Sequence, residues 1–314
     1  MRGKIDLGDC IEYVVDENES GQRIDKYISL KEADISRSYI QKLIKEGNIK
    51  INSEECKSNY KVCLNDHIVI EIPEAKELEI EAENIPLDII YEDDDIIVVN
   101  KPKGMVVHPA AGHYSGTLVN ALMYHCKNDL SGINGVLRPG IVHRIDMNTT
   151  GVIVACKNDY AHDKIAQQLS VHSITRKYYA IAQNAFKEQE GTVDAPIGRN
   201  PVDRKKMAID RKNGKRAVTH YKVLENFKNC AYVECQLETG RTHQIRVHMT
   251  SIGHPLLGDD VYSSGKSAYN LTGQTLHAGV LGFIHPRTGE YVEFSAPLPE
   301  YFQNVLNDLR MKNR

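Results

Sequence analysis

Hydrophobic and polar positions in the first 75 residues follow the spacing of two short helices and then of short strands. One helix is expected over residues 24–28, where apolar side chains recur at helical spacing. Ser36, a residue type that caps helix amino termini, begins a second helix, and Gly47 ends it. Strands are expected at residues 49–51 and 67–72, so this segment is predicted to be a small α/β module.

An acidic segment follows this module and indicates a domain boundary. Between residues 71 and 95 there are eleven acidic residues and a single base, Lys76. Two prolines, which interrupt regular structure, bound the central part of this segment. We therefore expect a module at residues 1–75, a linker at residues 76–87 and a larger domain at residues 88–314.

In the larger domain the pattern favours strands over helices. A helix is expected after a cap at Asn158 or Asp159. Another is expected after a cap at Thr242, with Ile252 among its inward-facing residues; a strand at residues 244–248 is the alternative, but the stop signal at residues 253–255 favours the helix. Because strands outnumber helices and rarely alternate with them, the predicted fold class is α+β with a mixed or antiparallel sheet. Strands are expected at residues 88–100, in two parts around an acidic turn, and at residues 152–156, 176–182, 219–224 and 231–237.

Composition is typical of a globular protein and argues against several classes. Apolar residues make up 41% of the chain and charged residues 26%, which is enough apolar material for a core. The longest run of Val, Leu and Ile is residues 96–99, far short of a membrane span, and the polar first 25 residues do not resemble a secretory signal. Seven cysteines without a C-x-x-C pair indicate a reducing compartment, so the cytoplasm is the predicted location.

Local charge changes the picture that the net charge of −3 suggests. Residues 22–61 carry nine bases against six acids, and residues 199–216 carry eight bases against two acids. A local basic patch, and not the net charge, is the feature that binds phosphate. Taken alone, however, either basic stretch is more often an ordinary solvent-exposed face. The second expected helix displays four side chains suited to RNA: Arg37, Gln41, Lys42 and Lys45.

Three polar clusters could carry chemistry, at residues 143–146, 176–178 and 240–246. Asp146 lies in a loop rich in Gly and Thr and, judged alone, is typical of a turn. The apolar residues around it are expected to be buried, however, and a buried carboxylate needs a cationic partner. Arg246 at the start of the expected helix can supply a two-pronged hydrogen-bonding group, although spacing alone does not establish the pair.

The sequence contains no motif for a metal or a common cofactor. His243 and His248 are five residues apart, which spreads them around a helix, and no zinc-type cluster occurs. There is no phosphate-binding loop, dinucleotide fingerprint or nucleophile elbow. We therefore expect a site that needs neither metal nor cofactor and that is built around one carboxylate.

Several motifs, in order, resemble those of the RluA-type pseudouridine synthases. Residues 143–151 read HRIDMNTTG and are similar to the H-R-L-D-x-x-T-[ST]-G motif of that family, with Ile145 and Met147 as mild departures. Residues 22–72 resemble the RNA-binding module of ribosomal protein S4. This combination is similar to the large-subunit ribosomal RNA enzymes, most closely their D type. The resemblance runs from about residue 85 to residue 302 and includes further motifs at residues 91–104, 240–259, 276–278 and 294–297.

The resemblance implies an enzyme that isomerises uridine in RNA, replacing the N1 glycosidic link by a carbon link at C5. Asp146 would be the nucleophile, attacking either the sugar or the base, and Arg246 would pair with it. Tyr178, at the end of a strand, would stack on the target base after that base leaves its own stack, and would assist removal of the C5 proton. Three further residues are expected to contact RNA: Arg144, Arg241 and His243.

The implied partner is large-subunit ribosomal RNA or a pre-ribosomal particle. The protein itself is expected to be a monomer that does not bind membranes. Two other classes of function are weighed against this one. A non-catalytic ribosome-assembly factor with this fold would lack Asp146, Tyr178 or Arg246, and all three are present. A glycosidase-like hydrolase would use two carboxylates around the bond, whereas one is expected here.

Overall fold

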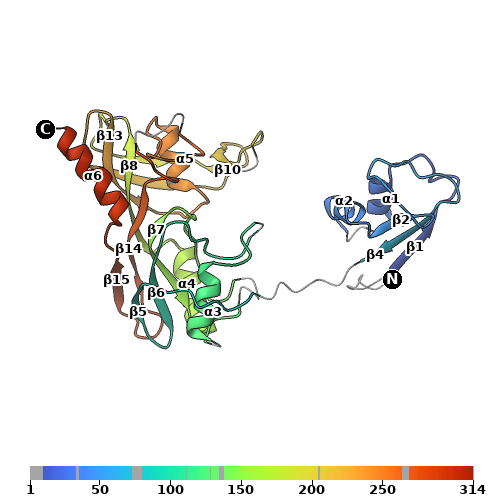
Figure 1. The fold of residues 1–314 in the computed structure, drawn as a ribbon, viewed down its shortest axis with the longest axis horizontal. Coiled ribbons are helices and arrows are strands. Elements are labelled where there is room, and N and C mark those ends of the chain that lie inside the picture. Colours follow the sequence, from blue (N-terminus) through green and yellow to red (C-terminus); the bar gives the residue numbers. More distant parts are fainter. Residues whose placement is uncertain are drawn as a thin grey trace. The chain divides into compact units, whose positions relative to one another are not determined.

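The computed structural model describes residues 10–32, 35–72, 80–110, 112–127, 129–133, 138–203, 206–263 and 269–313. The chain divides into two compact units, at residues 1–77 and 78–314 (Figure 1). Each unit is described by itself.

The first unit combines two helices with an antiparallel sheet whose four described strands lie in the order β1-β4-β2-β3. Ser36 accepts a hydrogen bond from the backbone N–H of Tyr39, and Gly47, with a φ of 76°, follows the end of the second helix. Both end signals predicted from the sequence are therefore confirmed. The elements are β1 (Cys10–Val14), α1 (Ile24–Lys31), α2 (Arg37–Lys45), β2 (Ile49–Ile51), β3 (Glu54–Glu55) and β4 (His67–Glu71).

The second unit is built on a large mixed sheet. Its strands are β5 (Ile89–Glu92), β6 (Ile96–Lys101), β7 (Thr150–Cys156), β8 (Thr175–Gln183), β9 (Glu190–Asp194), β10 (Ile197–Arg199), β11 (Met207–Ile209), β12 (Val218–Asn226), β13 (Cys230–Leu237), β14 (Leu276–Ile284) and β15 (Tyr291–Ser295). Its helices are α3 (Leu118–Cys126), α4 (Asp159–Ser170), α5 (Gln244–Ser251) and α6 (Glu300–Lys312).

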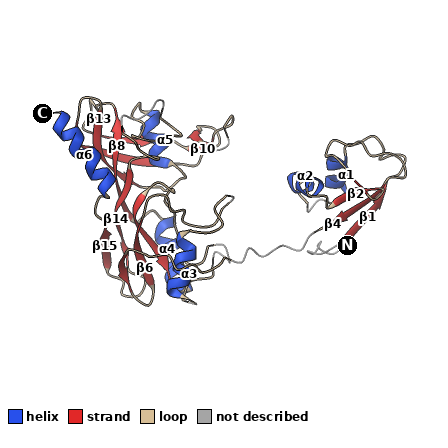
Figure 2. Ribbon diagram, viewed as in Figure 1, coloured by secondary structure: helices blue, strands red, loops and turns tan. Residues whose placement is uncertain are grey.

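In the described ranges, eight strands of this sheet lie in the order β5-β6-β7-β14-β8-β13-β12-β9, and β15 pairs with β14 (Figure 2). The strand pairs of this sheet are antiparallel, apart from β7 and β14, which run parallel. Strands β10 and β11 form a separate ribbon. The predicted α+β class with a mixed sheet is confirmed.

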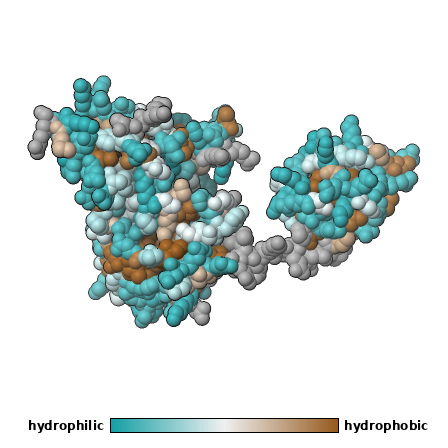
Figure 3. Space-filling model, in the orientation of Figure 1, coloured by the Kyte–Doolittle hydropathy of each residue, from teal (hydrophilic) through white to brown (hydrophobic). Residues whose placement is uncertain are grey.

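Alternating side chains of the sheet place helices on both of its faces. In β6, Ile97 and Val99 join the core that contains α3, whereas Ile96 and Val98 join the core that contains α4. Figure 3 shows a mostly hydrophilic surface, with hydrophobic residues gathered near β6 and β15. None of the described helices is long and apolar enough to cross a bilayer.

The second unit extends into the segment that was expected to be a linker at residues 76–87. Ile80 is buried in the core that contains α3, and the Asn120 side chain donates a 2.8 Å hydrogen bond to the Glu81 carbonyl. The apolar contact of Ile80 and the backbone partner of Glu81 explain why this acidic stretch belongs to the unit. Residues 73–79, which include part of the expected linker, lie outside the described ranges.

Helix α5 differs from its prediction at both ends. Thr242 does not cap it; the residue before its first turn is His243, which has a left-handed φ of 57° and makes no capping bond. The next residue, Gln244, explains this start, because its side-chain oxygen accepts the backbone N–H of Arg241 at 2.9 Å. Ile252 follows the last turn and is 38% exposed instead of facing inward.

Candidate active site

Asp146 lies in the loop that leads into β7, near the middle of the large sheet. The backbone N–H of Thr149 closes a turn onto the Asp146 carbonyl at 3.0 Å. The backbone N–H of Val154 donates to Nε2 of His143 at 3.2 Å, and this bond holds the loop against β7. Burial was predicted for residues 140–142 and 151–155, and it is confirmed for all of them except Val142, which is half-buried. The Asp146 side chain keeps 20% of its surface exposed.

Gly151 allows β7 to lie against β14 directly behind this loop. Its φ is 109°, and a Cβ atom at this position would lie 2.1 Å from the carbonyl oxygen of Ala278. These two residues pair across the parallel seam of the sheet. The glycine that closes the 143–151 motif is therefore required by close contact between two backbones.

A buried lysine supports the same loop. Nζ of Lys101 donates to the carbonyl oxygens of Pro102, Met105 and Met147 at 2.9, 2.8 and 3.0 Å. Burial lowers the pKa of Lys101 to about 7, and the charge of Asp146 opposes that shift. Three acceptors match the three N–H bonds of an ammonium group, so the charged form fits this position.

Arg246, in the first turn of α5, joins two carboxylates. Its Nη1 donates to Oδ2 of Asp146 at 3.0 Å. The two-pronged contact expected for Asp146 is made to Asp259 instead, from Nε and Nη2 at 2.8 and 2.9 Å. Although burial disfavours its charge, hydrogen bonds and charges from Asp259 and Asp146 raise the pKa of Arg246 above its ordinary value. Asp259 thus fixes a permanent cation beside Asp146.

His243 faces the other oxygen of the same carboxylate. Its Nε2 lies 3.9 Å from Oδ1 of Asp146, and its Nδ1 lies 2.8 Å from the hydroxyl of Tyr262. Burial lowers the pKa of His243, which favours the neutral ring. The Tyr262 hydroxyl also accepts the backbone N–H of Met207 at 2.8 Å, so Tyr262 links His243 to β11.

Tyr178 lies inside β8, not at the end of a strand as expected. The ring is buried, and burial raises the pKa of Tyr178, so the phenol is neutral. Because side chains alternate along a strand, Arg176 shares the face of Tyr178, while Lys177 lies on the opposite face. Tyr178 also lines the pocket that contains Asp146.

One small pocket, of about 50 Å³, brings together the site residues predicted in the second unit. In the described part of the chain, no three His, Cys, Asp or Glu side chains gather as metal ligands would. The predicted residues that line the pocket are Arg144, Asp146, Tyr178, Arg241, His243 and Arg246.

The other predicted RNA contacts lie on α2 in the first unit. Arg37 and Gln41 donate to the buried carboxylate of Asp25 at 3.1 and 2.7 Å. Lys42 and Lys45 are exposed. Two of the four side chains therefore hold α2 against α1, and two lysines extend into solvent.

No role was predicted from the sequence for Lys101, Asp259 or Tyr262. Lys101 and Asp259 lie within the segments that carried the family resemblance, so those motifs could have marked them as candidate site residues. Tyr262 had no such signal, because its contact with His243 depends on the path of the chain after α5.

This fold and this pocket define a class of RNA-modifying isomerase. Residues 95–251 match the family model for RNA pseudouridylate synthase, and residues 22–68 match that for the S4 domain. The chain belongs to the RNA pseudouridylate synthase family, and its enzyme class is RNA pseudouridine synthase.

Relatives of known sequence support the same assignment. The chain is 53% identical over 300 residues to the uncharacterized RNA pseudouridine synthase YlyB of Bacillus subtilis, covering 96% of this chain and 98% of that protein. It is 47% identical over 305 residues to the ribosomal large subunit pseudouridine synthase D of Zymomonas mobilis, covering 94% and 96%. Among solved structures, human RNA pseudouridylate synthase domain containing 4 is 26% identical with a TM-score of 0.55, covering 71% of this chain and 92% of that one.

Proposed function

We propose that this enzyme converts uridine to pseudouridine in large-subunit ribosomal RNA, with Asp146 as the nucleophile. The substrate is supported by relatives named ribosomal large subunit pseudouridine synthase D, from Zymomonas mobilis and Haemophilus influenzae, at 47% and 43% identity. Such a substrate would place the activity in the cytoplasm. The observation that carries the mechanism is the partly exposed Asp146 carboxylate, 3.0 Å from Arg246 in a pocket that Tyr178 lines.

The proposed reaction is balanced within one nucleotide. The bond from N1 to C1′ breaks, a bond from C5 to C1′ forms, C5 loses a proton and N1 gains one. Asp146 forms a temporary bond to the sugar or to the base and is released when the new carbon link is made. No oxidant, reductant or group donor enters this balance.

The two oxygens of Asp146 have different surroundings, which suggests different roles. Oδ2 accepts the hydrogen bond from Arg246, whose other contacts are fixed by Asp259. The ion-pair contact of Oδ1 among the described residues is His243, at 3.9 Å. We assign Oδ1, the less constrained oxygen, as the attacking atom.

Tyr178 and Arg144 fit the remaining steps. Removing a base from its stack costs a few kcal/mol, and stacking on an aromatic side chain returns about 1–3 kcal/mol. Tyr178 offers such a surface inside the pocket, and Arg144 is exposed at its rim, where it can occupy the space the base leaves. In the first unit, we propose that Lys42 and Lys45 contact RNA phosphates, joined by the exposed parts of Arg37 and Gln41.

Replacing Asp146 by Asn tests the mechanism. The wild-type enzyme is incubated with large-subunit ribosomal RNA, and pseudouridine is mapped by carbodiimide modification and primer extension. We expect no pseudouridine from Asp146→Asn, with RNA binding close to wild type, because the change preserves shape and removes the nucleophilic charge. Asp163→Asn, on the exposed side of α4, removes the same charge and is the matched control.

Two results would contradict the proposal. Near wild-type turnover by Asp146→Asn would reject Asp146 as the nucleophile. Tight RNA binding by the wild-type enzyme without any pseudouridine would favour the non-catalytic assembly factor.

A further inference from the structure

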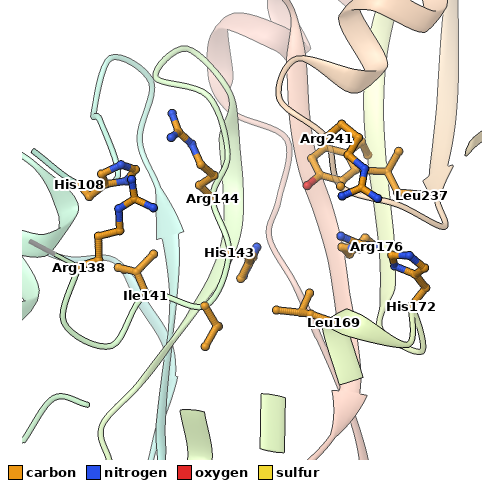
Figure 4. A pocket seen from close by; sticks show the side chains of 13 residues that line it. His108, Arg138, Ile141, His143, Arg144, Leu169, His172, Arg176, Leu237 and Arg241 are labelled. Carbon is orange, nitrogen blue, oxygen red and sulfur yellow. The ribbon is translucent and has the colours of Figure 1, made fainter. Parts of the chain in front are cut away.

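A second, larger cavity lies beside the Asp146 pocket. Its volume is about 350 Å³, within the range of sites that bind small molecules. Figure 4 shows two walls, with His108, Arg138 and Arg144 on one and Arg176 and Arg241 on the other. The two hollows are neighbours, because both are lined by Arg144, Tyr178, Leu237 and Arg241.

The charged groups of this cavity have one sign. Four arginines line it: Arg138, Arg144, Arg176 and Arg241. None of the described lining residues carries a carboxylate. Guanidinium groups bind phosphate through paired N–H donors, so an anion with several oxygens is the ligand class that fits.

Arg176 is built into the wall and keeps an unused donor. It is only 6% exposed, and its Nη2 donates to the Glu238 carbonyl at 2.7 Å. Gly240 packs against it so closely that a Cβ atom there would lie 2.6 Å from Nη1. Among the described residues its Nε has no hydrogen-bond partner. A buried guanidinium without all of its hydrogen bonds is costly, and an anion in the cavity would offset part of that cost by bringing an opposite charge beside it.

Two of the three histidines that line the cavity, His108 and His143, add uncharged polar groups. His108 is 5% exposed, and within the described ranges its Nδ1 has no partner. Burial, with help from nearby arginines, lowers the pKa of His108 to about 4 and that of His143 to about 3. His143 accepts the N–H of Val154 at Nε2, so its proton is on Nδ1. The permanent positive charges of the cavity are therefore those of the arginines.

We propose that this cavity binds the nucleotide next to the target uridine, with its phosphodiester group held by the arginines of the two walls. The inference rests on the proposed function, because a target base beside Asp146 and Tyr178 brings its own neighbour in the strand to the adjoining cavity. Phosphate contacts position a nucleic acid without reading its sequence. The cavity would thus set the register of the strand in the active site.

The test is a double-mutant cycle between the protein and one phosphate. A synthetic RNA stem-loop carries a uridine that the wild-type enzyme modifies, and matched RNAs carry an uncharged methylphosphonate on its 5′ or its 3′ side. Arg138→Gln changes an exposed residue and should not disturb folding; Arg176→Lys tests the buried wall. Lys177→Ala, next along β8 but on its opposite face, is the matched control.

At one of the two linkages, we expect methylphosphonate to raise the wild-type KM about tenfold, with kcat within about twofold, because one charge-assisted contact is lost. Arg138→Gln should raise KM about tenfold on the natural RNA and add less than about twofold on the neutral one, since both changes remove the same contact. Arg176→Lys should show the same lack of additivity. Lys177→Ala should match wild type on every RNA.

Failure of the inference is distinguishable from failure of the proposed function. If the wild-type enzyme forms pseudouridine but both arginine variants are additive with both neutral linkages, or have no effect on KM, the cavity does not hold a neighbouring phosphate. If the wild-type enzyme modifies no ribosomal RNA at all, the proposed function itself is wrong.

Discussion

Replacing Asp259 by Asn tests whether this residue positions Arg246. The Asn oxygen can still accept the backbone N–H groups of Val261 and Tyr262, as Oδ1 of Asp259 does at 3.0 and 3.1 Å. Its amide NH2, however, would face Nε–H of Arg246, which lies 2.8 Å from Oδ2. The pair is buried, with Asp259 2% and Arg246 4% exposed. Removing one partner of such a pair costs about 3–5 kcal/mol of the free energy of unfolding, against about 5–15 kcal/mol for a typical domain.

Amide hydrogen exchange of peptides from β8 and β14 measures this loss, because it reports the second unit alone, whereas bulk unfolding mixes two units. We expect kcat to fall at least about tenfold as well, since small displacements of catalytic groups cost up to about a hundredfold. The matched control is Asp260→Asn, which removes the same charge from an exposed neighbour. A stability loss below about 1 kcal/mol, or wild-type kcat in Asp259→Asn, would refute the positioning role.

Three further predictions follow from other parts of the chain. Removing residues 1–77 should make binding to structured RNA less dependent on salt concentration, because each phosphate contact steepens that dependence, while turnover on a short stem-loop survives. Equal losses of activity on both RNAs would instead mean that the first unit supports the fold of the second. Burial disfavours the charge of Asp25, yet three hydrogen-bond donors lower its pKa from 3.8 to about 2. The resulting contribution to stability, about 2 kcal/mol, is complete above the unfolded pKa and is lost as the pH falls through about 2. NMR signals of α1 amides should therefore show that Asp25→Asn is less stable near neutral pH and less sensitive to acid, and identical acid profiles would count against this account. Gly151→Ala should cost at least about 4 kcal/mol or prevent folding, because the new Cβ meets a backbone carbonyl. Gly289→Ala, at a φ of 72° in open space, should cost only about 1–2 kcal/mol when both variants are measured by amide hydrogen exchange of β8 and β14 peptides, and similar losses at the two sites would contradict the steric argument.

Elements whose ends depend on adjacent residues were predictable from the sequence. Ser36 and Gly47 act within one turn of α2, and the Asn158 side chain likewise caps α4 by accepting the backbone N–H of Ala161. The paired strands around residues 92–95 were also expected, since apolar runs on both sides of an acidic turn need only local pairing.

Contacts between distant segments were not predictable in the same way. The motifs indicated that Asp146 and Arg246 share a site, although they are 100 residues apart. They did not indicate that Arg246 would make its two-pronged contact with Asp259. Either carboxylate could accept that contact, and only the folded chain brings Asp259 into position for it. The left-handed start of α5 at His243 has a partly similar origin, since the Gln244 amide donates to the Val218 carbonyl at 2.9 Å and His243 contacts Tyr262, both outside this turn.

The central position of β14 has a consequence for the order of synthesis. β14 lies between β7 and β8, although it is made after both. Until residues 276–284 leave the ribosome, β7 and β8 each present an unpaired edge, which favours aggregation or capture by a chaperone. Leu276 also lines the Asp146 pocket, so the pocket has no complete wall before that moment. The Asp146 pocket is therefore completed only when β14 has been made and has paired with β7 and β8.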